Sequence, residues 1–216
     1  MQIDFISDTV CPWCFIGKRR LLSAMALRPS IAFDVRYRPY QLDPNVPREG
    51  LDRVQYMTTR FGADAKLDEA YRAISAEGIK EGIAFEWAAI RKRPNTVNSH
   101  RLIRWAEAQG VQDEVAERLF VSYFENGDDI GDIRVLADIA DLCGMDGAQI
   151  ADLLETDTDT AFVEREDKLA HEMGVTGVPA MIFANRIAVT GAREPEVLAM
   201  VIDKALEMPE PEAPTA

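Results

Sequence analysis

The amino-acid sequence predicts an α/β fold in which both ends of the chain form one domain and a large helical insertion separates them. Residues 1–45 follow the order strand, helix, strand. Residues 157–207 follow the order helix, strand, strand, helix, and the long segment between these two parts has helical periodicity. With 216 residues, 47% of them hydrophobic, the chain has enough apolar side chains for a proper core.

The first strand and the first helix flank two closely spaced cysteines. Gln2–Ser7 is an apolar run that predicts a buried strand, and a helical pattern follows over Phe15–Leu27. Ile31–Tyr37 alternates apolar and polar residues, which predicts a second strand. This βαβ order implies parallel strands joined by a right-handed crossover. We expect the side chains of Lys18, Arg19 and Arg20 to be solvated.

The middle of the chain, residues 46–156, is predicted to be an inserted helical domain. The insertion begins within a predicted loop, Tyr40–Gly50, that contains two prolines. An apolar stripe over Leu67–Ile74 predicts a helix that Gly78 ends, and Gly82–Trp87 is expected to be short and extended or irregular. Further helices are expected after Pro94-Asn95-Thr96, over residues 111–123, over residues 133–143 before Gly144, and over residues 148–154.

The end of the chain supplies the second half of the predicted domain. A helix starts near Thr158 or Asp159 and ends at Gly174. Residues 180–184 and 186–190 flank Asn185 and predict a β-hairpin, and Pro195 opens a last helix. Together with the first unit, this is the element order of a thioredoxin fold, with a discontinuous domain over residues 1–45 and 157–207. The tail, residues 208–216, is expected to be disordered.

Charge and composition exclude several classes of partner. A net charge of -13 argues against nucleic acid and anionic membranes, because both bind basic surfaces. No apolar run is long enough to span a bilayer, and Met1–Phe5 lacks the basic and apolar regions of a secretory signal. If the start is natural, we expect a cytoplasmic protein, although removal of an export signal would leave a similar start. The three cysteines are too few for a disulfide-stapled scaffold.

Cys11-Pro12-Trp13-Cys14 stands where the first strand gives way to the first helix, which makes it a candidate redox motif. Two residues between cysteines on a first helical turn can hold the sulfurs close enough to bridge. The first sulfur would face free backbone N–H groups and the positive end of the helix dipole, which favour thiolate over thiol. Pro12 suits the first helical position, because its missing N–H would have had no partner there. We expect Trp13 to be exposed, either as part of an apolar substrate platform or only to tune the motif.

The same two cysteines could also be half of a zinc site, which would need two more ligands. Cys143, His100 and His171 are the remaining soft donors, and none stands in a paired spacing. We therefore favour redox chemistry and predict no metal. Cys143 ends an apolar helical stripe and is expected to be a small core residue, with a third redox thiol as the alternative. His171 is expected to be structural or solvated.

The motif and several further segments resemble the DsbA-like thioredoxin superfamily, and within it the FrnE-like oxidoreductases. The resemblance extends over nearly the whole chain. It rests on Cys11-Pro12-Trp13-Cys14 after an N-terminal strand and on Gly174-Val175-Thr176-Gly177-Val178-Pro179 before a hairpin. Further segments typical of that branch are Phe5-Ile6-Ser7-Asp8, Ile16–Arg20, Pro94-Asn95-Thr96, His100–Trp105 and Val189–Ala192.

The resemblance implies which residues surround the dithiol. Val178–Pro179 would be a cis peptide bond in a loop that lies against the dithiol. The backbone of Val178 would then pair with an extended peptide or a glutathione, as in strand addition. In relatives with bound glutathione, the segment that starts at Pro94 lies near the ligand cleft, so Asn95 and His100 are further candidates. Otherwise Thr96 or Asn98 is simply a helix cap. The candidate substrate-binding residues are thus Pro12, Trp13, Val178, Pro179, Asn95 and His100.

These observations favour a thiol–disulfide oxidoreductase or isomerase that acts on protein or small-molecule disulfides. Cys11 is assigned as the nucleophile, and Cys14 as the residue that resolves the mixed disulfide. No cofactor is expected, with glutathione as a possible co-substrate, and the oligomer is left open between monomer and homodimer. The alternative is a kappa-class glutathione transferase or a 2-hydroxychromene-2-carboxylate isomerase, although those groups carry serine where this chain has Cys11. A third class is a polyketide-tailoring or chaperone-like binding role.

Overall fold

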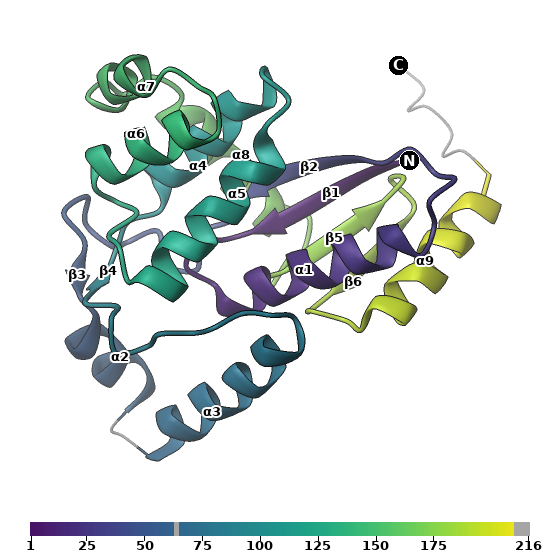
Figure 1. The fold of residues 1–216 in the computed structure, drawn as a ribbon, viewed down its shortest axis with the longest axis horizontal. Helices are drawn as coiled ribbons and strands as arrows, with labels where there is room; N and C mark the ends of the chain where they lie inside the picture. Colours follow the sequence, from purple (N-terminus) through teal and green to yellow (C-terminus); the bar gives the residue numbers. More distant parts are fainter. Residues whose placement is uncertain (63–64, 210–216) are drawn as a thin grey trace.

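A four-stranded mixed sheet connects the two ends of the chain. The structure, a computed structural model, describes residues 1–62 and 65–209. Across the sheet the strands are β2 (Asp34–Pro39), β1 (Gln2–Ser7), β5 (Ala180–Phe183) and β6 (Ile187–Thr190). β1 pairs parallel with β2 and antiparallel with β5, which itself pairs antiparallel with β6. The first strand therefore lies beside a strand from the far end of the chain (Figure 1).

Most helices belong to the long segment between β2 and β5. α1 (Pro12–Ala26) follows β1, and α9 (Pro195–Glu207) follows β6. The segment between β2 and β5 also contains a short two-stranded sheet. Its elements are β3 (Leu51–Asp52), α2 (Arg53–Phe61), α3 (Ala65–Lys80), β4 (Lys92–Arg93), α4 (Val97–Glu107), α5 (Gln112–Val121), the π-helical turn η1 (Ser122–Asn126), α6 (Ile133–Leu142), α7 (Gly147–Leu154) and α8 (Thr160–Glu172).

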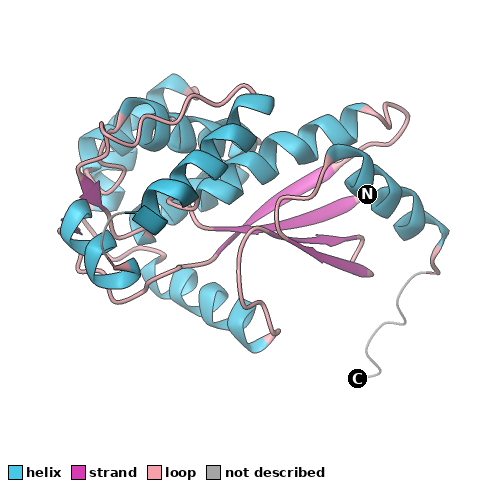
Figure 2. Ribbon diagram, turned by 90° about the horizontal axis from the view of Figure 1, so that it is seen from below, coloured by secondary structure: helices cyan, strands magenta, loops and turns pink. Residues whose placement is uncertain are grey.

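Helices lie on both sides of the four-stranded sheet (Figure 2). α1 and α9 pack against each other, and α9 also contacts β5. α4, α5 and α8 contact β2. The order β1–α1–β2, then α8–β5–β6–α9, is that of a thioredoxin fold, which confirms the predicted α/β fold with a large helical insertion. The division into domains at residues 45/46 and 156/157 stays a prediction.

Among the predicted elements whose bounds differ in the structure, two differ for clear physical reasons. β2 begins at Asp34 instead of Ile31, because β1 starts at Gln2, which pairs with Asp34, and no strand lies beside the preceding residues. α3 continues past Gly78 to Lys80. A Cβ atom on Gly78 would lie 2.5 Å from the ring of Phe85, so this glycine allows a close approach and does not end the helix. The predicted hairpin and the parallel pairing of the first two strands are both present.

The basic run of α1 is largely buried, contrary to the expectation that it would be solvated. Lys18 and Arg20 are only 1% and 3% exposed. The Lys18 Nζ atom lies 3.1 Å from Asp113 and 2.9 Å from Glu117, both on α5. Arg19 is half-buried and pairs with the same Glu117. A cation becomes buried when acids on other elements complete its bonds, and the pattern of a single helix does not reveal such partners.

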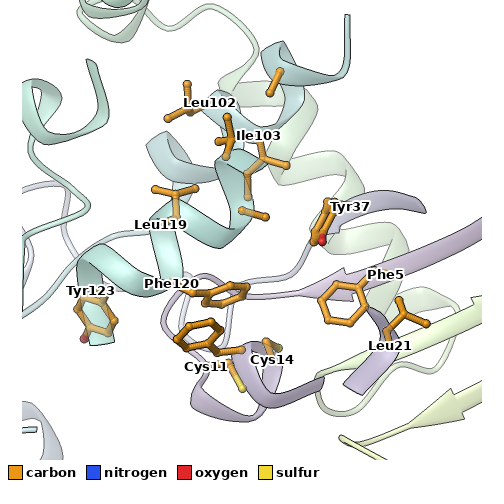
Figure 3. Packing of buried hydrophobic residues seen from close by; sticks show 14 of the residues in the cluster. Phe5, Cys11, Cys14, Leu21, Tyr37, Leu102, Ile103, Leu119, Phe120 and Tyr123 are labelled. Atoms are coloured by element: carbon orange, nitrogen blue, oxygen red, sulfur yellow. The ribbon is translucent and has the colours of Figure 1, made fainter. Parts of the chain in front are cut away.

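Aromatic side chains join the insertion to α1. Phe15 of α1 stacks on Phe120 of α5, with ring centroids 5.2 Å apart, and Phe124 lies 6.2 Å from Phe15. Phe85 meets Phe15 edge-on and stacks on Trp87 at 4.6 Å. Cys11, Cys14 and Phe120 belong to the same cluster of buried hydrophobic residues (Figure 3). The core of the insertion thus packs directly against the helix that carries the dithiol.

The remaining expectations concern membranes and the tail. Within residues 1–62 and 65–209, no helix has the length and apolar composition that crossing a membrane requires. The tail was predicted to begin at residue 208, but residues 210–216 lie outside the described part of the chain.

Candidate active site

The start of α1 presents the first cysteine as an N-cap residue. Cys11 has an extended backbone (φ -94°, ψ 113°), and Pro12 occupies the first helical position, as predicted. The Cys11 carbonyl accepts the N–H of Cys14 at 3.0 Å and of Phe15 at 3.4 Å. The Cys11 side chain therefore stands at the end of the helix where backbone N–H groups are free and the dipole is positive.

The two thiols differ in their environment. Cys11 is 5% exposed and Cys14 is 0% exposed, whereas Trp13 between them is 37% exposed, as expected. Burial is the main cause that raises the pKa of the Cys14 thiol well above its ordinary value, and the neighbouring Cys11 and the negative charge of Asp8 raise it further. Cys11 is thus the more accessible of the two thiols, and Cys14 lies behind it as a protonated thiol.

The loop before β5 lies across the dithiol. The Val178–Pro179 peptide bond is cis, and the Cys11 Sγ atom points at the Val178 carbonyl, 3.6 Å away. Behind the loop, Pro179 packs on α1 at Gly17, where a Cβ atom would lie 2.8 Å from the proline Cγ. The structure thus brings Cys11, Val178 and Pro179 together, from opposite ends of the chain.

Replacement of Gly17 by alanine is expected to slow disulfide exchange about tenfold or more, because the new methyl group would push the Pro179 ring and displace the loop from Cys11. In an open helix the change would stabilise by about 1 kcal/mol. Here the overlap costs about 1–3 kcal/mol and cancels that gain. Steady-state rates with a disulfide substrate check the prediction. Ser23→Ala, at an exposed position of the same helix, is the control and should keep the wild-type rate.

Asp8, in the turn between β1 and α1, is a buried acid beside the dithiol. It is 0% exposed, and its carbonyl accepts the Cys11 N–H at 3.0 Å. Its Oδ2 atom accepts the Leu42 N–H at 2.8 Å, and Oδ1 lies 3.7 Å from the His100 Nε2 atom. Acids between a strand and a helix are usually solvated turn residues, so only the three-dimensional packing distinguishes this one.

His100 and Asn95, the two other candidate substrate-binding residues, do not belong to the group formed by Cys11, Val178 and Pro179. His100 is 4% exposed, and its Nε2 atom lies 3.2 Å from the Tyr40 carbonyl, so burial argues against direct contact with a substrate. Asn95 donates to the Val46 carbonyl at 2.6 Å and accepts the Val97 N–H at 3.0 Å. It lines a cavity of about 490 Å³ between the loop after β2, the start of α4 and α8, and neither cysteine lines that cavity. Substrate binding by these two residues stays a prediction.

The other soft donors lie apart from the motif. Cys143 is 7% exposed within the core, as expected, and burial is the main cause that raises the pKa of its thiol. The ring of His171 lies against that of Tyr40, with centroids 4.5 Å apart and the planes tilted by 39°, and its Nε2 atom lies 3.6 Å from Asp167. In the described part of the chain, no three histidine, cysteine or acidic side chains are grouped closely enough to hold a metal ion.

The family to which the chain belongs follows from its match to one family model. The model of the DSBA-like thioredoxin domain matches residues 2–203. The chain is a member of this DSBA-like family. The DSBA-like assignment agrees with the sheet order, with the cis Val178–Pro179 bond and with the dithiol at the start of α1.

Known proteins are similar to this DSBA-like chain over nearly its whole length. The uncharacterized protein YwbO of Bacillus subtilis (strain 168) is 27% identical over 203 residues, which cover 94% of this chain and 96% of YwbO. The probable DsbA oxidoreductase SCO1869 from Streptomyces coelicolor has a TM-score of 0.88 at 24% identity, over 100% of this chain and 94% of that one. The cytosolic disulfide reductase DsbM from Pseudomonas aeruginosa, in a structure with GSH, has a TM-score of 0.68 at 16% identity, over 96% and 100%.

Proposed function

We propose that the protein is a thiol–disulfide oxidoreductase or isomerase with Cys11 as its nucleophile and Cys14 as its resolving thiol. The observation that carries this proposal is the position of Cys11. It caps the N-terminus of α1, faces the Val178 carbonyl at 3.6 Å and has a buried second thiol one turn away. Within the family, the motif segments quoted above favour the FrnE-like branch.

The reaction that this arrangement supports is a two-step exchange. The Cys11 thiolate attacks one sulfur of a substrate disulfide, so that the substrate S–S bond breaks and one substrate thiolate leaves and takes up a proton. A mixed disulfide between Cys11 and the other half of the substrate remains. Cys14 then loses its proton and attacks the Cys11 sulfur, which releases the second substrate thiol and forms a Cys11–Cys14 disulfide. Two molecules of a small thiol such as glutathione, which together become one molecule of its disulfide, restore the dithiol.

The surroundings of Cys11 fit an extended substrate. The Val178 backbone lies opposite the attacking sulfur, and Trp13 offers an exposed apolar surface beside it. We infer that the substrates are protein or small-molecule disulfides and that glutathione is a co-substrate, with no other cofactor. The similarity to DsbM, whose structure contains GSH, supports glutathione and a cytoplasmic location.

Three cysteine variants test the proposal. Cys11→Ser is expected to reduce the rate of glutathione-dependent protein disulfide reduction to the uncatalysed level, because no nucleophile remains. Cys14→Ala is expected to accumulate a mixed disulfide on Cys11, which intact-protein mass spectrometry detects as one added glutathione. Cys143→Ala, which removes a buried thiol far from the motif, is the matched control and should keep the wild-type rate. Wild-type turnover by Cys11→Ser would refute the proposal.

The glutathione transferase or isomerase alternative gives a different outcome in the same experiment. In those relatives a serine stands at the position of Cys11, so Cys11→Ser would bind glutathione tightly and conjugate it to an electrophile. We expect neither property, because the intact pair of thiols supports exchange chemistry instead.

A further inference from the structure

Two basic side chains of the insertion lie near the carboxylate of Asp8. Arg93 of β4 is 6% exposed and places its Nη2 atom 3.9 Å from Oδ2, and His100 of α4 lies 3.7 Å from Oδ1. Burial disfavours the charge, but His100, Arg93 and the Leu42 N–H outweigh it and hold the pKa of Asp8 below its ordinary value. A negative charge is therefore fixed in the protein interior beside the dithiol.

One oxygen of this carboxylate is incompletely satisfied. Within the described residues, Oδ1 has no hydrogen-bond partner, since His100 stands just beyond hydrogen-bonding distance and its Nε2 atom lies nearer to the Tyr40 carbonyl. A buried acceptor without a donor costs free energy, and such groups are uncommon in folded proteins. The negative charge of Asp8 is thus only partly neutralised by its partners. The part of the charge that is not neutralised acts on neighbouring ionisable groups.

The negative charge of Asp8 acts on the dithiol, since it contributes to the raised pKa of the Cys14 thiol. The Asp8 carbonyl accepts the Cys11 N–H at 3.0 Å, which ties the residue that carries the charge to the first cysteine. A reduced pair carries negative charge once a thiolate forms, whereas the disulfide is neutral. A fixed negative charge nearby disfavours the thiolate form and so favours the disulfide, and a nearby cation has the opposite effect.

We propose that Asp8, balanced by Arg93 and His100 of the insertion, is a positioning residue that sets the equilibrium between the dithiol and the disulfide of Cys11 and Cys14. The insertion would thereby tune the redox equilibrium without contacting the substrate. This inference rests on the proposed function, because it presupposes that the pair cycles between these two states.

The equilibrium concerned is exchange with glutathione. Two molecules of reduced glutathione convert the Cys11–Cys14 disulfide to two thiols and become one molecule of oxidised glutathione, so two electrons and two protons pass to the protein. The full-length protein is equilibrated in buffered mixtures of the two glutathione forms. The fraction of dithiol is then read by acid quenching, alkylation of free thiols and mass spectrometry.

Asp8→Asn, which removes the charge and keeps the shape, is expected to raise the ratio of dithiol to disulfide about tenfold at fixed glutathione, the equivalent of one pKa unit. Arg93→Met, which removes the cation, is expected to lower the ratio. Thr9→Val is the structural control. It breaks the 2.8 Å bond between the Thr9 and Ser99 hydroxyls, which ties the same loop to the same helix, but it changes no charge. Its ratio should stay within twofold of wild type.

The possible outcomes separate this inference from the proposed function. A wild-type pair that never exchanges with glutathione refutes both. If the wild type equilibrates, the inference is overturned by an Asp8→Asn ratio within twofold of wild type, by an equal shift in Thr9→Val, or by a shift of Arg93→Met in the same direction as Asp8→Asn. If Asp8→Asn does not fold, the direction of the Arg93→Met shift decides, since a lower ratio supports the inference and an unchanged or higher ratio overturns it.

Discussion

Replacement of Arg20 by methionine is expected to lower the free energy of unfolding by about 3 kcal/mol, because it removes one side of a buried charge network. The Arg20 side chain is 3% exposed. Its Nε atom donates to Glu81 at 2.8 Å, its Nη1 atom donates to the Ala192 carbonyl at 2.7 Å, and its Nη2 atom pairs with Glu77. Methionine fills similar space but donates nothing, so Glu81, whose side chain is 11% exposed, loses its counter-charge. Urea unfolding measures the loss: the midpoint concentration should fall, while the slope of the unfolding free energy against urea concentration stays the same.

Two further variants test whether the loss in Arg20→Met comes from the buried ion pairs. Arg134→Met is the matched control, since its side chain is 91% exposed and lies 3.6 Å from Asp132. We expect it to change stability by less than about 0.5 kcal/mol. Arg20→Lys keeps the charge but cannot donate to α3 and to the Ala192 carbonyl with the same forked geometry, so it should fall between methionine and wild type. If Arg20→Met has the same midpoint of urea unfolding as the wild type, these ion pairs do not stabilise the packing of α1 on α3.

Gly127→Ala is expected to cost roughly 3 kcal/mol, from about 1 kcal/mol for a left-handed backbone and about 2 kcal/mol for steric overlap. Gly127 ends η1 with a φ of 79°, a conformation that disfavours residues with a Cβ atom. A Cβ atom there would lie 2.6 Å from the backbone carbon and oxygen of Ala89. Because these are main-chain atoms, no side-chain rotation can relieve the overlap. Thermal or urea unfolding measures the loss.

Gly110→Ala separates the two contributions. Gly110 has a φ of 72°, close to that of Gly127, but a Cβ atom there would meet nothing within 4 Å. It should therefore lose only the backbone contribution, about 1 kcal/mol. Equal losses in the two variants would contradict a role for the Ala89 contact and leave the backbone conformation as the whole cause.

The parts that the sequence predicted depend on local patterns. Alternation and apolar runs located β1, β5 and β6, and Pro12 after Cys11 marked the start of α1. The resemblance to a known family placed Val178 and Pro179 at the dithiol, which periodicity alone could not do. The strongest site prediction therefore combined a local motif with the arrangement of distant segments that the family resemblance implies.

The parts that the sequence did not predict depend on partners far along the chain. Lys18 and Arg20 look like solvated residues until acids on α5 and α3 are placed beside them. Asp8 looks like a turn residue until Arg93 and His100 approach it. Gly78 looks like a helix stop until Phe85 packs on it. In each case a long-range contact overrides the local preference.

The antiparallel pairing of β1 with β5 has a consequence for synthesis of the protein. Ile3 pairs with Phe183, and Cys11 faces Val178 across 167 positions of sequence. On the ribosome, the two cysteines emerge first, and the strand and loop that cover them emerge only after the whole insertion. The nascent chain therefore exposes its thiols, uncovered, for most of its translation. Contacts of such long sequence separation also close slowly, so the candidate active site is completed among the last steps of folding.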